Sequence, residues 1–402
     1  MKWVVSLLLV FVSGCRPHPD RGKPNSLLLF DRREIRAIKE KIAHRDSCVR
    51  SVAERLRTQA DRSMHAGPWS VTFAPTRAAS GSPHDFFSEG PYWWPDPKNP
   101  NGPYVRRDGE VNPDRFTAHD NALKEMAISV MTLGLASYVY DDAVYAQYAA
   151  TVIRTWFADE KTRMNPHLEY GQAIKGVTSG RGIGIIDSTP FIWALQGMAL
   201  LRETGFWSGT DQGAVEAWFR QYLQWLTTSR KGLDEKFNGN NHSTWWAAQA
   251  AAIAVYLNDS STQDTLWTFY REYLVPHQIE PDGSCPLEEA RTKSLSYSAM
   301  NLNGFAVFCR LAGSRGEDLW HFRSANGASM EKALQYLMPF VLEPHRWKKQ
   351  QIAPFDNRRR IFLVLSGLDL EKPEYLRYYR NMQMSDDPVS ILGDLMAACT
   401  IE

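Results

Sequence analysis

The sequence predicts an all-α fold in a single domain, built from antiparallel pairs of helices. From about residue 31 onward, most of the chain places apolar residues at intervals of three and four, which is the pattern of amphipathic helices. The alternation that indicates strands is scarce, and the connections between successive helices are short, so neighbouring helices should run antiparallel. This pattern does not by itself distinguish a closed helical toroid from an open solenoid.

The first residues predict export. MKWVVSLLLVFVSG combines one early lysine with an apolar run too short to span a bilayer, which is typical of a secretion signal. The tetrad VSGC, ending at Cys15, resembles a bacterial lipobox whose cysteine is lipidated; a plain signal peptide cut near the same place is the alternative. We expect a signal peptide over 1–15, a proline-rich polar tether over 16–30 and a folded domain over 31–402, in a periplasmic or outer-membrane lipoprotein.

Composition excludes some classes of partner. The 46 Lys+Arg against 45 Asp+Glu give a net charge of +1, so no global positive field indicates nucleic acid or a charged membrane, and membrane contact is expected only through Cys15. The aromatic content of 12% suits a groove in which flat rings meet sugars. Cys48, Cys285, Cys309 and Cys399 show no CxxC spacing, so no metal site through sulfur is expected, and the sequence leaves their pairing open.

The expected helices are interrupted by two long irregular stretches. Residues 66–118, rich in Pro, Gly, Trp and Asp, and residues 159–187 carry no helical pattern, and long loops within a compact domain tend to be functional. Some helices have recognisable starts, such as DSTP at 187–190, where capping side chains precede a proline. Helices are expected over roughly residues 31–62, 120–139, 141–158, 188–205, 211–229, 242–258, 262–276, 296–313, 329–343 and 386–400.

The sharpest local feature is the polar cluster NGNNHSTWW, residues 238–246, which runs directly into the apolar helix AAQAAAIAVYL. Asn241 and His242 would lie at a helix N-terminus, where free backbone N–H groups and the helix dipole favour a bound carboxylate. An asparagine beside a histidine can also donate hydrogen bonds to that carboxylate and exchange a proton next to it. A plain Asn/Gly turn with a capping histidine is the alternative.

A second cluster, EEARTKSLSYS over residues 288–298, places fixed cations near Tyr297, just before another helix. Arg291 is suited to holding a sugar carboxylate in a bidentate pair. Nearby cations favour the phenolate form of a tyrosine, which would let Tyr297 shuttle protons although its ordinary pKa is about 10. Taken alone, Glu, Arg and Lys at these spacings more often form a solvated helix face.

Two further clusters lie in the long loops. GPYWWPDP, residues 90–97, would make a rigid edge for stacking on sugars, with core packing of the tryptophans as the alternative. NPHLEYGQ, residues 165–172, carries polar groups that could line a groove together with an arginine at 181. The residues expected to contact a ligand are Tyr92, Trp93, Trp94, Asn165, Tyr170, Gln172, Arg181, Asn240, Trp245 and Glu289.

In combination, YWWPDP, NPNGPYVRRDG, MNPHLEYGQAIKG, RGIGIID, NNHSTWWAAQ and RTKSLSYSAMNL resemble the alginate lyase domain family of polysaccharide lyases. The matches run in order from about residue 85 to 305, which makes them far more specific together than any one alone. The resemblance implies an (α/α) toroid of roughly five to seven antiparallel helix pairs, with a cleft for an anionic glycan and no obligatory metal or cofactor. It implies a uronate polymer as substrate, of the alginate, mannuronan or glucuronan type.

The resemblance also implies roles for four residues. Asn241 would neutralise the substrate carboxylate, and His242 would assist or act as the base. Arg291 would pair with the carboxylate or polarise the phenol, and Tyr297 would deliver a proton to the leaving oxygen. These types are needed together because the C5 proton of a uronate is only weakly acidic until the charge of the adjacent carboxylate is offset.

Two other functions remain open from the sequence. Glycoside hydrolysis on the same kind of toroid would use a carboxylate pair such as Glu288 or Glu289 with Asp187. A surface glycan-binding lipoprotein would keep the aromatic groove without turnover. Mere binding does not require a proton-transfer tyrosine, so the joint presence of the four residues favours the lyase.

Overall fold

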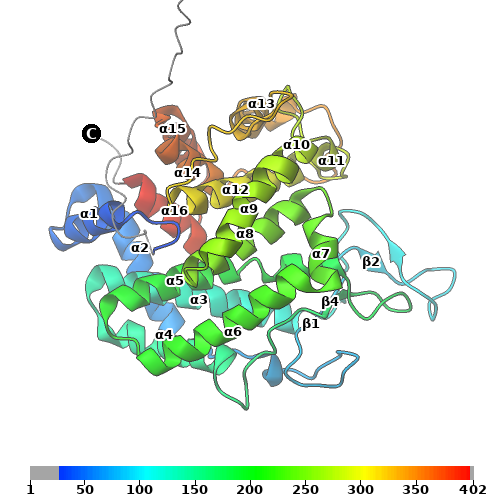
Figure 1. Ribbon diagram of the computed structural model, residues 1–402, viewed down its shortest axis with the longest axis horizontal. Helices are drawn as coiled ribbons and strands as arrows, with labels where there is room; N and C mark the ends of the chain where they lie inside the picture. The colour runs from blue at the N-terminus through cyan, green and yellow to red at the C-terminus, as the bar shows by residue number, and fades with distance from the viewer. Residues whose placement is uncertain (1–26, 399–402) are drawn as a thin grey trace, which may run out of the picture.

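The structure, a computed structural model, describes residues 27–398 and is predominantly helical over that range (Figure 1), which confirms the all-α class. The expected signal peptide with Cys15, most of the expected tether, and Cys399 lie outside the described residues. The α-helices are α1 (Arg32–Ala43), α2 (Ser47–Met64), α3 (Ala118–Tyr140), α4 (Ala143–Phe157), α5 (Phe191–Thr204), α6 (Gly209–Thr228), α7 (Arg230–Lys236), α8 (Asn241–Tyr256), α9 (Ser260–Phe269), α10 (Val275–Gln278), α11 (Pro286–Glu289), α12 (Ser294–Gly313), α13 (Met330–Leu342), α14 (Ile361–Asp369), α15 (Pro373–Asn381) and α16 (Pro388–Ala398).

Within this range the helices pack as six pairs arranged in a ring. The inner helices contact one another in the order α3, α5, α8, α12, α14 and α16, and α16 returns to contact α3 and α2. The outer helices are α4, α6, α9, α13, α15 and α2; the first five each connect one inner helix to the next along the chain, and α2, which precedes α3, packs against α3 and α16. This arrangement is consistent with the expected toroid (Figure 1).

Inner and outer helices differ in their sequence patterns. The inner helix α8 is apolar on every side and nearly all of its residues are buried, whereas the outer helix α13 is amphipathic and buries one face. By length and composition, Ala118–Tyr140 and Gly182–Thr204 would suffice to cross a membrane, but 72% of each window is buried inside the protein. These two segments are therefore core helices of the ring.

The inner helices α3 and α5 touch through glycines. A Cβ atom on Gly134 would lie 2.4 Å from the backbone oxygen of Gly197, and one on Gly197 would lie 2.3 Å from that of Val130. No side chain fits in this contact, because the obstructing atoms are backbone. The absence of side chains at these two positions brings the helix backbones together.

All the inner helices begin at one end of the ring, which we call the mouth. The first turns of α3, α5, α8 and α12 border one cavity there, and those of α5, α14 and α16 border a second. The two long irregular stretches meet at the mouth through a parallel pair, β1 (Phe87–Glu89) with β4 (Tyr170–Ala173), beside an antiparallel pair, β2 (Trp93–Trp94) with β3 (Val105–Arg106). In Figure 1, β1, β2 and β4 lie on the right, next to α7.

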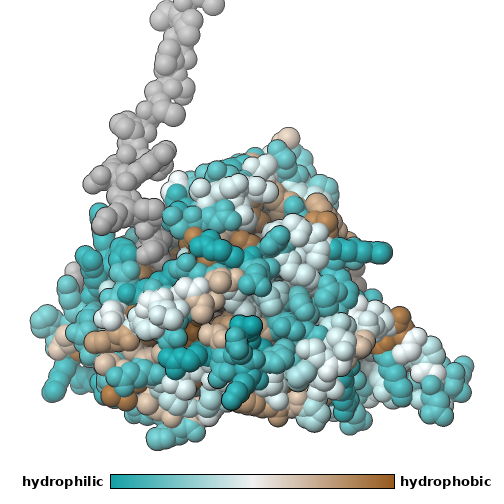
Figure 2. All heavy atoms as spheres, turned by 60° about the horizontal axis from the view of Figure 1, so that its bottom comes forward, coloured by the Kyte–Doolittle hydropathy of each residue, from teal (hydrophilic) through white to brown (hydrophobic). Residues whose placement is uncertain are grey.

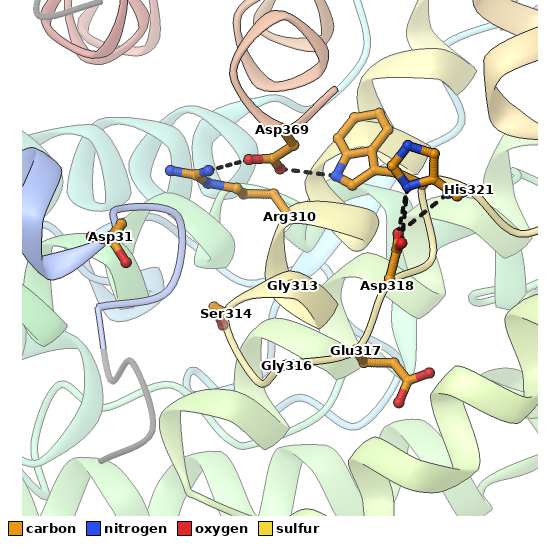
Figure 3. A pocket seen from close by; sticks show the side chains of 10 residues that line it. Asp31, Arg310, Gly313, Ser314, Gly316, Glu317, Asp318, His321 and Asp369 are labelled. Carbon is orange, nitrogen blue, oxygen red and sulfur yellow. Dashed lines mark hydrogen bonds and ion pairs between the residues drawn. The ribbon is translucent and has the colours of Figure 1, made fainter. Parts of the chain in front are cut away.

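The opposite end, which we call the closed end, is covered by α1 and the buried segment 27–30 before it. Arg310, in the last turn of α12, donates to the backbone oxygen of Leu29 at 2.8 Å and forms ion pairs with Glu34 of α1 and Asp369 of α14. Figure 3 shows Asp369 beside this guanidinium, and the Trp320 indole donates to the same carboxylate at 2.9 Å. These charged groups pair with one another, so we assign a structural role to the pocket that Arg310 and Asp369 line (Figure 3).

Several helices differ from the sequence prediction. The helix expected over 31–62 is two helices, because Arg45 adopts a left-handed φ of 57° and Asp46 caps α2 by accepting from the Cys48 N–H. The short helices α7, α11, α14 and α15 were not predicted. The stretch 66–118 contains short strands and a 3₁₀ turn up to the start of α3 at Ala118. The stretch 159–187 contains a short strand and a 3₁₀ turn and no α-helix.

The face of the protein shown in Figure 2 is largely hydrophilic, with hydrophobic atoms in small separate groups. Exposed large hydrophobic side chains such as Phe73, Val144 and Ile352 belong to segments distant in the sequence. Scattered exposure of this kind is normal for a folded surface and indicates no broad apolar docking area on this face.

Candidate active site

A cavity of about 470 Å³ lies at the mouth, bordered by the first turns of four inner helices and by the loops that carry β1 to β4. The chain brings segments together there that are separated by up to about two hundred residues, so motifs distant in the sequence share one wall. Nine of the residues that the sequence singled out line it, namely Tyr92, Trp93, Gln172, Arg181, Asn240, Asn241, His242, Arg291 and Tyr297.

His242 is positioned by the start of α8. Gly239 adopts a φ of 90°, which ends the preceding turn, and the Asn240 side chain caps α8 by accepting from the His242 N–H at 2.9 Å. The His242 Nδ1 atom lies 2.8 Å from Oε1 of the fully buried Glu235 on α7. Burial raises the pKa of Glu235, and His242 acts in the opposite direction; when Glu235 is ionised it accepts from Nδ1–H, which leaves Nε2 as the nitrogen free to take a proton.

Asn241 is held by a second buried acid, Glu288 of α11. The Asn241 backbone N–H donates to Glu288 at 2.5 Å, and its Nδ2 donates to both carboxylate oxygens at 3.0 and 2.9 Å. Burial raises the pKa of Glu288, while these bonds from Asn241 act in the opposite direction. The Oδ1 atom of Asn241 is buried and has no partner within residues 27–398, so it is an unsatisfied acceptor at the edge of the cavity.

Arg291 is fixed by Asp108, which comes from the loop after β3. The guanidinium donates Nε and Nη2 to the two Asp108 oxygens at 3.1 and 2.8 Å, and Thr292 donates its hydroxyl to the same carboxylate at 3.1 Å. Burial opposes ionisation of Asp108, but the bonds from Arg291 and Arg106 outweigh it and hold the pKa of Asp108 well below its usual range. Arg291 is therefore a fixed, oriented cation.

Tyr297 lies against that cation. Its ring is 3.8 Å from the Arg291 guanidinium carbon, and its hydroxyl oxygen is 2.6 Å from that of Tyr92. Burial is the main cause that raises the pKa of Tyr297 well above its ordinary value, and Arg291 offsets only part of that rise. The expectation of a favoured phenolate is therefore wrong for the ligand-free protein, in which Tyr297 is a neutral phenol able to donate a proton.

Gln172 organises the wall opposite α8. Its backbone has a left-handed φ of 49°, which is strained for a residue with a side chain, and its N–H donates to Ser88 at 2.7 Å. Its Nε2 donates to Asp187 at 2.8 Å, and its Oε1 accepts from Arg181 at 2.8 Å. One side chain thus links an arginine to a buried aspartate.

The sequence prediction missed Asp120 and gave Asp187 only as a possible hydrolase acid. Asp120 is 7% exposed, and its Oδ1 has no hydrogen-bond partner among the described residues. Burial, and then the neighbouring Asp187, raises the pKa of Asp120 to about 8; burial also raises the pKa of Asp187. The signal for Asp120 was its spacing, because it shares a buried helix face with Leu123 and Ala127.

Cations outnumber anions on the cavity wall. The basic residues are Arg106, Arg115, Lys124, Arg181 and Arg291, and the acidic ones are Glu89, Asp120 and Asp187. Arg181 forms no ion pair within residues 27–398, and burial lowers its pKa to about 10. Because Asp120 and Asp187 are poorly ionised, the cavity favours an anionic ligand.

Three residues predicted to contact a ligand lie outside this cavity, where two of them form hydrogen bonds within the loops and the third packs against a loop cluster. The Trp94 indole donates to the backbone oxygen of Glu110 at 3.0 Å. Asn165 donates to Asp85 at 2.7 Å. Tyr170, in β4, packs against the small buried cluster around Phe87.

Trp245 and Glu289 also lie outside it. Trp245 is 7% exposed, one helical turn beyond His242, and borders the second cavity at the mouth. Glu289 is engaged by an ion pair with Lys349. Across residues 27–398, no group of three or more His, Cys, Asp or Glu side chains has an arrangement that could hold a metal ion. Cys48, Cys285 and Cys309 are free thiols.

Comparisons with known proteins agree with this picture. A family model described as alginate lyase matches residues 70–347. The crystal structure of an alginate lyase from Bacteroides ovatus is 32% identical, with a TM-score of 0.85, covering 91% of this chain and 98% of that chain. No curated protein matches the sequence.

Two more distant structures support the fold alone. Alginate lyase A1-III from Sphingomonas species A1 is 18% identical with a TM-score of 0.52, over 80% of this chain and 86% of that chain. A histidine-to-alanine variant of alginate lyase A1-III, complexed with a tetrasaccharide, is 17% identical with a TM-score of 0.53, over 85% and 86% of the two chains.

Proposed function

The chain belongs to the alginate lyase family and is a polysaccharide lyase, and from this premise we propose that the 470 Å³ cavity at the mouth performs β-elimination on a uronate polymer. One observation carries the assignment. His242, with Nδ1 held by a buried acid, shares the cavity with a neutral Tyr297 that lies against the fixed cation Arg291. This set can offset a carboxylate charge, accept a proton and donate one.

The proposed reaction begins when the substrate carboxylate binds among Arg291, Asn241 and His242. For its NH₂ group to face that carboxylate, the Asn241 amide must turn over so that Oδ1 faces Glu288. A protonated Glu288 accommodates this turn because it can then donate to Oδ1, and burial raises the pKa of Glu288. The charge that develops on the carboxylate as C5 loses its proton is stabilised by these groups.

The proton transfers follow from the two side chains. A base removes the C5 proton, the electron pair forms the C4–C5 double bond, the C4–O bond breaks, and Tyr297 protonates the leaving oxygen. Where the C5 proton and the leaving oxygen lie on opposite faces, as in guluronate, Nε2 of His242 is the base. Where they share one face, as in mannuronate or glucuronate, Tyr297 serves as both: its phenolic proton first passes to Nε2 of His242 in the same cavity, the phenolate then removes the C5 proton, and the re-formed phenol protonates the leaving oxygen.

Hydrolysis fits the structure less well. A hydrolase needs two carboxyl groups placed on either side of the scissile bond. Glu288 is committed to Asn241, Glu289 is paired with Lys349, and Asp187 is bonded to Ser88 and Gln172. A binding protein without turnover would have no use for the His242–Glu235 pair beside a proton-donating tyrosine.

We also propose that the protein is exported and anchored by a lipid on Cys15. The lipobox-like tetrad and the polar segment after it support this, and both lie outside the described residues. Labelling cells with a fatty-acid analogue tests it: the wild type should carry the label and sediment with membranes, and Cys15→Ser should not. Label on Cys15→Ser, or none on the wild type, would contradict the anchor.

The activity test follows ultraviolet absorbance of the new double bond while the mature protein acts on a panel of uronate polymers. We expect a rise with at least one polymer, abolished by Tyr297→Phe. Loss with His242→Ala would assign the base to histidine, and retention would assign it to tyrosine. Tyr378→Phe and the exposed His345→Ala are the matched controls. New reducing ends without absorbance would refute elimination.

A further inference from the structure

A second cavity, of about 210 Å³, lies beside the first at the mouth. Two helices, α8 and α12, lead from one to the other, because each contributes a residue to both walls one turn apart. On α8 these residues are His242 and Trp245, and on α12 they are Met300 and Asn303. On α5, Trp193 follows the proline that precedes the helix. A polymer in the first cavity therefore has a short path to the second.

The far wall of this cavity carries three consecutive arginines just before α14. Arg358 pairs with Asp356 at 2.6 Å, and Arg359 pairs with Asp394 at 2.6 Å. Arg360 forms no ion pair within residues 27–398. Its Nη2 donates to the backbone oxygen of Asp356, and its Nε is buried without a partner. Arg360 is half-buried against the Phe355 ring, 5.0 Å from its centroid, and the nearby Asp356 pairs with Arg358, so no carboxylate is paired with Arg360 itself among the described residues.

A second unsatisfied donor borders the same cavity. The Trp245 side chain is 7% exposed, and its Nε1 has no partner within residues 27–398. A buried indole N–H ordinarily finds an acceptor. The half-buried Trp193 adds an aromatic wall to the same cavity. Because the Trp245 Nε1 atom is closed to solvent, Trp245 borders the cavity with its ring, and two aromatic rings beside Arg360 suit a carboxylate carried on a sugar ring.

The acids on this wall leave the arginine available. Asp356 is paired with Arg358, and Asp387 accepts from the Ser390 hydroxyl at 2.6 Å and from its N–H at 3.0 Å. Burial lowers the pKa of Arg360, with Asp356 acting against that effect, so an incoming carboxylate would restore the favourable ionic environment that burial removes.

We propose that this second cavity is a binding subsite for the carboxylate of a uronate unit other than the one being cleaved, with Arg360 as its cation and the Trp193 and Trp245 rings as its walls. The inference rests on the proposed function and deepens it. It predicts that the enzyme favours substrates long enough to reach both cavities.

The test measures steady-state kinetics of Arg360→Gln on uronate oligosaccharides of defined length. We expect KM for long oligosaccharides to rise about 10- to 100-fold, KM for the shortest cleaved ones to stay unchanged, and kcat to stay unchanged throughout. Arg377→Gln, an exposed arginine on α15, is the matched control and should behave as the wild type. Should Arg360→Gln fail to fold, Arg360→Lys replaces it and should give a smaller rise with the same length dependence.

A second measurement uses long oligosaccharides whose carboxyl groups distant from the cleaved bond are reduced to alcohols. The wild type should lose affinity for them, and Arg360→Gln should not distinguish them from the parent sugar. A KM increase that is equal at every length, or no increase at all, would overturn the subsite. If the wild type cleaves no uronate polymer, the proposed function itself fails.

Discussion

Asn241 and His242 are neighbours in the chain, yet each is held by a different acid from a different helix. Glu235 on α7 fixes the histidine ring, and Glu288 on α11 fixes the asparagine amide. Both acids are buried, so each is a positioning residue that acts through its partner. Adjacent residues can therefore be perturbed separately.

Replacing Glu235 with Gln tests this positioning. Gln has nearly the same shape but no charge to orient and stabilise a protonated His242, so kcat should fall about 100-fold while KM is unchanged. Steady-state kinetics measures both. Glu125→Gln, on the exposed side of α3, is the control. An equal loss in KM with kcat preserved would indicate a role in binding instead.

The Asp120–Asp187 pair predicts a stability that depends on pH. The folded protein retains a proton on Asp120 up to about pH 8, whereas the unfolded chain releases it near its ordinary value, so stability falls as pH rises between the two. Asp120→Asn removes this loss. Its melting temperature should match that of the wild type in acid and exceed it increasingly toward pH 8. Parallel curves for the two proteins would contradict a proton retained on Asp120.

For single residues, the sequence predicted the reactive side chains but not the acidic side chains that hold them in place. Asn241, His242, Arg291 and Tyr297 lie in recognisable local motifs. Their supporting acids lie in segments whose proximity exists only after folding, and an isolated acid in a loop, such as Asp108, gives no local signal. The neutral state of Tyr297 could not be predicted from the sequence either, because it depends on burial of the side chain rather than on the residues next to it in the chain.

At the level of the helices, the contact between α3 and α5 leaves no space for a side chain at Gly134 or Gly197. Gly197→Ala would place a methyl group against the backbone of α3 and should lower the free energy of unfolding by about 1–3 kcal/mol. Gly213→Ala on α6 is the control, since nothing lies within 4 Å of its added Cβ, and it should stabilise the protein by about 0.5–1 kcal/mol. Denaturant unfolding measures both, and equal effects would refute the close contact.

The elements that sequence missed share a physical reason. The helix α14 is apolar on every side, so it lacks the periodicity by which an amphipathic helix is recognised. The helices α7 and α11 have only seven and four residues, too few for a period to show. The break at Arg45 depends on a left-handed backbone angle that no residue type there demands.

For the whole molecule, the parallel inner helices direct their N-termini toward the mouth. The positive ends of several helix dipoles and an excess of cations therefore act on the same volume. KM for a uronate polymer should rise about tenfold between low and high salt, with kcat unchanged, because salt screens this attraction. A flat KM in a salt titration would contradict it, and an unchanged unfolding midpoint would exclude a general salt effect on the fold.

With the proposed lipid on Cys15, the position of the closed end would decide which side of the enzyme faces the bilayer. The described chain begins at Leu27 against the C-terminal ends of the inner helices, where Lys39 of α1 pairs with Asp141 just after α3. The proposed lipid on Cys15 would therefore be attached on the side of the closed end, opposite the mouth. Its open side would face away from the bilayer toward the medium that delivers long polymers, and cleavage would not require a polyanion to approach the lipid headgroups.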